Sequence, residues 1–283
     1  MINYNDLFDS RVIIVSGVAR SGTSILGKTL GCADNAIYFF EPVFLKICKI
    51  AKANSVFTQT LFFEDFVLQA ARGYHVNVVK GSLSWWKELY SQTSIMEEVV
   101  GMGRGDTINA LHQSPVRYVI KLTEGYMYKD YLEKVFPDMW FIEIIRNGNS
   151  VIGSSQAKTR IRGVGDPWYD DNYFKQDPFG WPWWVENLES FKTMTSIERA
   201  AHMWRVATCP QYTLKYEQLF NLDKSYWEKL YQKLGLDWST LTDYSLKTIA
   251  FHGNQSSRYP DFTSQIREPE RSKFLESMKK RGY

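Results

Sequence analysis

The most constraining feature of this chain is an apolar run that enters a glycine-containing turn and leads directly into an amphipathic segment. Residues 12–15 (Val-Ile-Ile-Val) predict a buried strand, and the apolar spacing that follows predicts a helix over residues 22–30. The turn between them contains Gly17 and Gly22 and ends in small hydroxyl residues. The first N–H groups of such a helix point at one spot, where the helix dipole is positive, so the turn predicts an anion-binding site.

The turn differs from the loop with which many proteins bind nucleoside triphosphates. That loop, GxxxxGK followed by Ser or Thr, has lysine directly after its second glycine. This chain has Thr23 at that position, and its nearest cation is Arg20, which precedes Gly22. A P-loop nucleotide kinase or NTPase and a non-catalytic nucleotide-binding relative stay open as alternatives, but the displaced cation favours another phosphate-bearing donor.

Strand-like and helical patterns alternate along the rest of the chain. Further strands are expected at residues 36–40, 117–121, 140–145 and 212–215, and further helices at residues 43–72, 85–112, 126–136, 149–158, 198–207 and 226–234. Such alternation predicts an α/β fold, a single P-loop-type domain over residues 1–283 with a mostly parallel sheet flanked by helices on both faces. Ligands bind beyond the carboxyl ends of the strands in such folds, where Arg20, Glu41, Lys121 and Arg146 are expected.

Charge and cysteine content exclude several classes of partner. A net charge of +3 is too small for a nucleic-acid-binding face. The three cysteines Cys32, Cys48 and Cys209 have no metal-ligand spacing, and an odd, sparse count argues against a disulfide framework and for a reducing compartment. No window approaches the length of a membrane span, and the first ten residues do not resemble a signal peptide. We therefore expect a cytoplasmic protein, whose oligomeric state the sequence leaves open.

A second candidate phosphate site follows the most strand-like segment. Arg146 stands at the end of that strand, and Ser154 lies about two turns along the next helix. Both side chains can therefore face one phosphate, and the planar fork of arginine can bond two of its oxygens at once. Taken alone, the pair is better explained as a surface arginine and an ordinary helix serine, but its combination with the first turn favours a phosphate site.

Together these elements resemble sulfotransferases that use 3′-phosphoadenosine-5′-phosphosulfate (PAPS). In that family a loop like Arg20–Ser24 holds the 5′-phosphosulfate, and an arginine with a serine eight positions on, here Arg146 and Ser154, holds the 3′-phosphate. Residues 214–219 (Leu-Lys-Tyr-Glu-Gln-Leu) are similar to the family's Arg-Tyr-Glu-Asp-Leu stretch. The resemblance implies a donor site made of Arg20, Ser21, Gly22, Thr23, Ser24, Arg146, Ser154 and Tyr216.

The resemblance also implies how the reaction proceeds. PAPS carries an activated sulfuryl group, so no metal ion is required, and catalysis rests on positioning and on stabilising charge during in-line transfer. Arg20 is expected at the leaving phosphate. Lys121, which matches a lysine of the tyrosylprotein branch, is expected at the transferring sulfuryl oxygens. The alternative for Lys121 is a solvated lysine at a strand end.

A general base must take the proton of the acceptor hydroxyl. In the carbohydrate and tyrosylprotein branches a glutamate follows the loop by about twenty residues, and Glu41 in the sequence Phe-Glu-Pro looks most like carbohydrate 6-O-sulfotransferases. Glu41 is therefore the expected base, and its alternative is a glutamate that stabilises a helix N-terminus. Cytosolic small-molecule sulfotransferases use a histidine instead, for which His75 is the nearest candidate.

Two further segments bear on ligand binding. Arg258 falls where the family places a loop over the 3′-phosphoadenosine, although the family's second glycine is missing; a surface turn is an equal alternative. An inserted aromatic-rich loop at about residues 160–187 contains Trp168, Trp181 and Trp184, whose faces can stack on sugar or aryl rings. We expect this loop to bind the acceptor, a carbohydrate or a small aryl or alkyl molecule with a hydroxyl; alternatively its aromatics only fasten it to the core.

Overall fold

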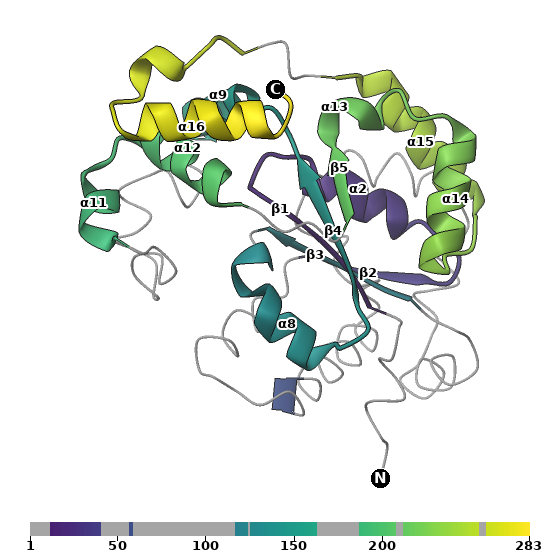
Figure 1. Cartoon of the computed structure of the whole chain (residues 1–283). Helices are drawn as coiled ribbons and strands as arrows, with labels where there is room; N and C mark the ends of the chain where they lie inside the picture. The colour runs from purple at the N-terminus through teal and green to yellow at the C-terminus, as the bar shows by residue number, and fades with distance from the viewer. Residues whose placement is uncertain are drawn as a thin grey trace.

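The computed structural model describes residues 12–40, 57–58, 117–123, 125–162, 187–207, 212–254 and 259–283. Its centre is one sheet of five strands, ordered β2-β3-β1-β4-β5, in which every neighbouring pair is parallel (Figure 1). The strands are β1 (Val12–Gly17), β2 (Ala36–Phe40), β3 (Arg117–Thr123), β4 (Trp140–Ile145) and β5 (Tyr212–Lys215). The predicted parallel sheet is confirmed.

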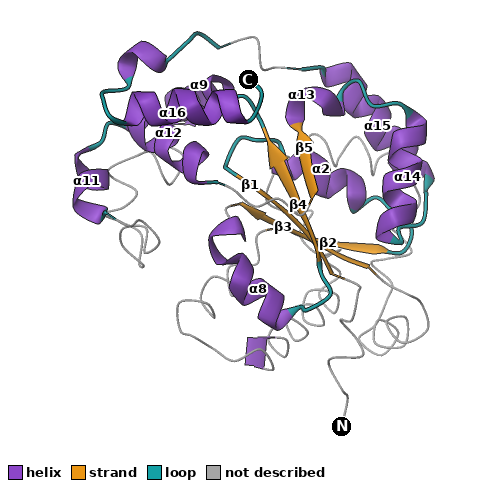
Figure 2. Ribbon diagram, viewed as in Figure 1, coloured by secondary structure: helices purple, strands orange, loops and turns teal. Residues whose placement is uncertain are grey.

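Helices surround this sheet (Figure 2). The α-helices are α2 (Thr23–Leu30), α8 (Lys129–Val135), α9 (Gly148–Arg162), α11 (Leu188–Thr193), α12 (Ser196–Val206), α13 (Tyr216–Leu219), α14 (Lys224–Leu234), α15 (Thr240–His252) and α16 (Glu270–Lys280). Within the described residues two 3₁₀ turns accompany them, η2 (Gly125–Tyr128) and η4 (Thr263–Gln265). None of the described helices is long and apolar enough to cross a membrane.

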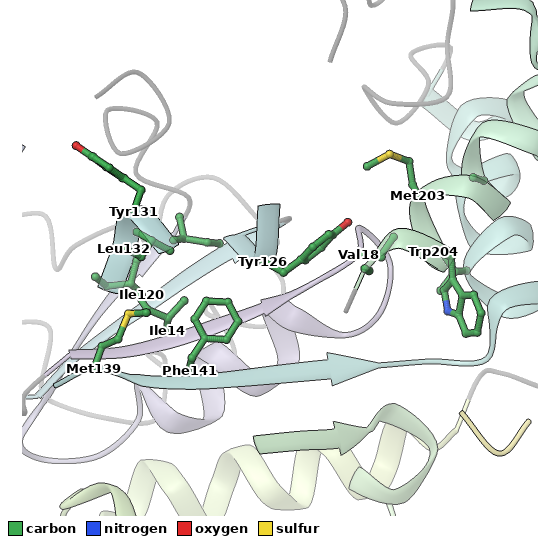
Figure 3. Close-up of a cluster of buried hydrophobic side chains, with 14 of the residues drawn as sticks. Ile14, Val18, Ile120, Tyr126, Tyr131, Leu132, Met139, Phe141, Met203 and Trp204 are labelled. Carbon is green, nitrogen blue, oxygen red and sulfur yellow. The ribbon is translucent and has the colours of Figure 1, made fainter. Parts of the chain in front are cut away.

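Alternate side chains of the strands build two cores, because successive residues of a strand point to opposite faces. Ile14 and Phe141 face a cluster that includes buried residues of α8, α9, α12 and α16 (Figure 3). Ile13 and Ile142 face a second cluster, which α2, α14 and α15 complete. Helices therefore cover both faces of the sheet, as predicted, and the three central strands β3, β1 and β4 are buried on both sides.

The predicted element bounds differ from the observed ones in informative places. The helix expected over residues 126–136 begins as the 3₁₀ turn η2 and becomes α-helical only in α8. The sequence pattern does not predict α15, because the face that this helix buries is partly polar. Its Ser245 side chain shares a 2.9 Å hydrogen bond with Thr29 of α2, so the apolar period that marks a helix is interrupted. The helices expected at residues 43–72 and 85–112 and most of the loop expected at 160–187 lie outside the described residues.

The carboxyl ends of four strands meet at one edge of the sheet. Gly17 at the end of β1 pairs with Thr123 at the end of β3, and Ile145 at the end of β4 pairs with Lys215 at the end of β5. The turns that follow β1 and β4 and the start of α13 are therefore neighbours, although they are far apart in sequence. This edge carries the candidate site.

Candidate functional site

The turn between β1 and α2 is tight enough to require glycine. Gly22 adopts φ 98° and caps α2, and a Cβ atom on it would lie 2.5 Å from Cδ2 of Tyr216. A Cβ atom on Gly17 would lie 2.4 Å from the carbonyl oxygen of Ile144. Both contacts are closer than real side chains tolerate, so the two glycines allow the turn to pack directly on β4 and α13.

The same turn presents donors toward the end of the sheet. The N–H groups of Thr23 and Ser24 lie in the first turn of α2, where no preceding helical carbonyl is available to accept them. The side chains of Ser21 and Thr23 are buried beside these groups, and that of Ser24 is half-buried. This combination of helix dipole, amide donors and hydroxyls suits an anion.

Arg20 connects this turn to the turn after β4. Its backbone is left-handed, with φ 72°, a conformation that costs a residue other than glycine on the order of 1 kcal/mol. Its Nε donates a 3.1 Å hydrogen bond to Ser154 Oγ, and its carbonyl oxygen accepts a 3.2 Å bond from a terminal guanidinium nitrogen of Arg146. The two turns that the sequence analysis singled out therefore form one continuous site.

Arg146 is a buried cation with aromatic neighbours. Its guanidinium carbon lies 4.2 Å from the ring centroid of Tyr216 and 5.9 Å from that of Tyr259. Burial lowers the pKa of Arg146 from its ordinary value, and the charge of Arg20 adds to this, while the two tyrosines and Glu217 oppose it. The side chain is only 5% exposed, so its charge acts in a medium where attraction to an anion is stronger than in water.

Ser154 occupies a crowded part of α9 beside this cation. It is buried, and its neighbour Gly153 lies against Tyr259, whose Cδ1 would be 2.5 Å from a Cβ atom on that glycine. The missing side chain therefore lets Tyr259 approach the helix and reach Arg146.

Lys121 lies inside β3, two residues before the strand ends, and not at a solvated strand end. It is 4% exposed and donates a 2.6 Å hydrogen bond from Nζ to Thr123 Oγ1. A Cβ atom added to Gly27 of α2 would lie 3.2 Å from the Cβ atom of Lys121. Lys121 is therefore on the face of the sheet that α2 covers. Burial and the charge of Lys121 together lower the pKa of nearby Lys28 to about 8.

A model of the sulfotransferase family matches residues 12–240, which include both turns, Lys121 and Tyr216. The chain belongs to the sulfotransferase family. No curated protein sequence matches this chain significantly.

Solved sulfotransferase structures are similar at low sequence identity. The sulfotransferase domain of the olefin synthase from Synechococcus PCC 7002 is 14% identical, with a TM-score of 0.42, over 97% of this chain and 96% of that domain. Sulfotransferase STF1 from Mycobacterium tuberculosis is also 14% identical, with a TM-score of 0.43, over 96% of this chain and 78% of that chain.

Several predicted site residues of this sulfotransferase lie outside the described residues. They are Glu41, His75, Trp168, Trp181, Trp184 and Arg258. Glu41 directly follows β2, whose last residue Phe40 pairs with Lys121 of β3. Among the described residues, no group of three or more His, Cys, Asp or Glu side chains is arranged to hold a metal ion.

The structure also adds residues to the candidate site that the sequence did not indicate. Tyr259 contacts Arg146 from a segment more than one hundred residues away in sequence. Trp204 of α12 donates a 2.7 Å hydrogen bond from Nε1 to the carbonyl oxygen of Arg146. Neither residue lies in a local motif, and only the folded chain brings them to the site.

Proposed function

We propose that this protein transfers a sulfuryl group from PAPS to the hydroxyl of an acceptor. Membership of the sulfotransferase family supports sulfuryl transfer. The single observation that carries the choice of donor is the contact of Arg20 with both Ser154 and Arg146. This contact makes two anion-binding turns adjacent, as a donor with phosphate groups on both sides of one ribose requires.

The residues present fit such a donor. The amides of Thr23 and Ser24, with the hydroxyl of Ser21, would bind the 5′ side, because they lie at the positive end of α2. Arg146 and Ser154 would bind the 3′-phosphate, since arginine can donate two parallel bonds to phosphate oxygens. The ring of Tyr216, under the guanidinium of Arg146, would hold that group in place.

PAPS supplies a sulfuryl group that is already activated, so the protein needs to position it and to stabilise charge. Arg20 has five N–H donors, one of which bonds Ser154, and its fork would stabilise the charge that develops on the leaving phosphate. Lys121 would stabilise the oxygens of the sulfuryl group. Its short bond to Thr123 restricts the ammonium group before the reaction starts.

Glu41 would act as the general base. It would take the proton of the acceptor hydroxyl while that oxygen bonds to sulfur and the bond from sulfur to the leaving phosphate oxygen breaks. Its place directly after β2, the strand beside Lys121, supports this role, and His75 is the alternative base. Trp168, Trp181 and Trp184 would bind the acceptor, a carbohydrate or a small aryl or alkyl molecule. We propose a cytoplasmic site of action.

Isothermal titration with 3′-phosphoadenosine 5′-phosphate tests the donor assignment. We expect binding at micromolar levels that is lost in Arg146→Ala, and no detectable binding by the wild type would overturn the proposal. Labelled PAPS with phenols, sugars, lipids and peptides then identifies the acceptor. Glu41→Gln should lower the transfer rate by about 10²–10⁴-fold with donor affinity nearly unchanged.

The alternatives give different results in the same experiments. A P-loop kinase or NTPase would turn over Mg²⁺-ATP in a manner abolished by Arg20→Ala. A non-catalytic relative would bind the bisphosphate but transfer nothing to any acceptor. If His75→Ala lowers the rate and Glu41→Gln does not, histidine is the base.

A further inference from the structure

The turn between β4 and α9 is bound by side chains from distant parts of the chain, beginning with its first residue. The carbonyl oxygen of Arg146 accepts a 2.7 Å hydrogen bond from Trp204 Nε1. The guanidinium of Arg281, just after α16, lies 4.4 Å from the centroid of the Trp204 ring. It also donates to the carbonyl oxygens of Trp204 and Ala207 at the end of α12. Arg281 therefore fixes the position of the Trp204 indole, which in turn donates its hydrogen bond to the backbone of Arg146.

The second residue of the turn is connected to the same segment through a carboxylate. The N–H of Asn147 donates a 2.9 Å bond to Glu217 Oε1, and the hydroxyl of Tyr283 donates a 2.9 Å bond to Glu217 Oε2. Burial and neighbouring Glu217 raise the pKa of Tyr283, so its hydroxyl keeps the proton that it donates. The Nζ atom of Lys215 lies 4.8 Å from the Tyr283 ring centroid and donates to the carbonyl of Gly282, which fixes the ring.

The first residue of α9, directly after the turn, contacts α16. The N–H of Gly148 donates to the sulfur of Met278 at 3.3 Å, and a Cβ atom on Gly148 would lie 2.6 Å from Cζ of Phe274. The chain end therefore lies against the start of α9 and near α13, where Figure 1 marks it.

We propose that Met278, Arg281 and Tyr283, which we call the α16 clamp, are positioning residues that orient Arg146 for the 3′-phosphate of the donor. This inference rests on the function proposed above. Arg281 and Tyr283 fix Arg146 from two directions, while Met278 accepts the N–H of Gly148 at the start of α9. One route ends at the carbonyl of Arg146, and the other ends at Glu217, whose neighbour Tyr216 places its ring 4.2 Å from the guanidinium carbon.

Such a clamp affects affinity because it removes a cost of binding. A long side chain that is free to rotate loses conformational entropy when a ligand orders it, whereas one already held in position does not. The clamp residues do not need to touch the donor themselves. Their loss is therefore expected to weaken only those ligands that use the guanidinium of Arg146.

Tyr283→Phe tests the clamp with the smallest available change, because it removes one hydroxyl and keeps the ring. The measurement is the dissociation constant of the full chain for 3′-phosphoadenosine 5′-phosphate and for adenosine 5′-monophosphate, which lacks the 3′-phosphate. We expect the first to rise about threefold to tenfold and the second to change by less than about twofold. Met278→Leu, which keeps volume but removes the sulfur acceptor, should act in the same direction.

The matched control is Tyr226→Phe, which removes a hydroxyl that shares a 2.8 Å bond with Tyr212 at the amino end of β5. It should leave both dissociation constants unchanged. The clamp is overturned if Tyr283→Phe and Met278→Leu remain folded and either leave both constants unchanged or raise them equally. If the wild type itself does not bind the bisphosphate, the donor assignment fails instead, which is a separate outcome.

Discussion

Arg20 and Ser154 are 134 residues apart in sequence, yet Arg20 Nε donates a 3.1 Å hydrogen bond to Ser154 Oγ. The carbonyl oxygen of Arg20 accepts a second bond, from Arg146. One residue of the first turn thus contacts both members of the pair that the sequence assigned to a separate phosphate. The sites that we propose for the two ends of the donor are therefore expected to be energetically coupled.

Ser154→Ala measures that coupling. In the proposed donor site, loss of the hydroxyl would remove a donor to the 3′-phosphate and also release the guanidinium of Arg20, so we expect 3′-phosphoadenosine 5′-phosphate to bind about tenfold more weakly. Isothermal titration measures this change. Ser155→Ala, on the same helix one residue further on and also buried, is the matched control. Equal effects of the two substitutions would show that Ser154 has no special part in binding.

Gly22→Ala tests whether the first turn requires its close approach to α13. Alanine would be strained at φ 98°, and its Cβ would overlap the Tyr216 ring at 2.5 Å. We expect the free energy of unfolding to fall by about 2 kcal/mol or more, together with loss of donor binding. Thermal and urea unfolding measure the stability. The control is Gly253→Ala, which also has positive φ, 62°, but nothing within 4 Å of the added atom. A similar loss in both variants would contradict a role for the contact with Tyr216.

The sequence predicts correctly those parts of the fold that depend on residues close together in the chain. The apolar run of β1, the glycines after it and the helical spacing of α2 lie within twenty residues, and the structure has this strand, turn and helix. Arg146 stands directly after β4, as predicted, because the apolar strand ends there. Such features need no information about the rest of the chain.

The remaining features depend on tertiary contacts that leave no local pattern. Trp204 and Tyr283 act on the turn after β4 from positions 58 and more residues away, and neither is part of a motif. The sequence predicts that Lys121 ends a strand, because its charge interrupts an apolar run, but β3 continues to Thr123 and Lys121 is buried. The roles of Glu41 and His75 stay predictions, since both lie outside the described residues.

Glu198 is expected to make the free energy of unfolding depend on pH in the acidic range. Its carboxylate is bonded by Nε and a terminal nitrogen of Arg267, which together with Thr195 lowers the pKa of Glu198 to about 2 although burial opposes the shift. The folded pKa is below the ordinary 4.5, so this pair stabilises the protein above about pH 4.5 and the effect is lost as the pH falls from there toward 2.

Glu198→Gln tests this dependence and keeps the capping geometry of α12, because glutamine also serves in a capping box. Urea unfolding should show the variant less stable than the wild type at pH 7, with the difference shrinking by pH 3. Glu276→Gln, at an exposed position on α16, is the control and should not reproduce that pattern. A difference that is the same at both pH values would contradict the role of the charge.

Lys28 should make the free energy of unfolding depend on pH in the alkaline range. It is 5% exposed on α2, and burial together with Lys121 lowers its pKa from 10.5 to about 8, although Cys32 opposes the shift. Between these two values the unfolded chain binds more protons at Lys28 than the folded protein does. The contribution of Lys28 to the free energy of unfolding therefore rises between about pH 8 and pH 10.5, by at most about 1.4 kcal/mol for each pH unit.

Lys28→Met isolates this contribution, because Cys32 titrates in the same range with the opposite sign. Burial raises the pKa of Cys32 to about 12 from an ordinary 9.0, so the folded state keeps a thiol proton that the unfolded chain loses, and its stability falls as the pH rises. Cys32 is present in both proteins, and its effect largely cancels in the difference. Wild-type minus variant free energies of unfolding, measured with urea at pH 7.5, 8.5 and 9.5, should increase with pH. The exposed Lys279→Met should show no such trend, and a flat Lys28 difference would mean that the amine is as easily protonated in the folded protein as in water.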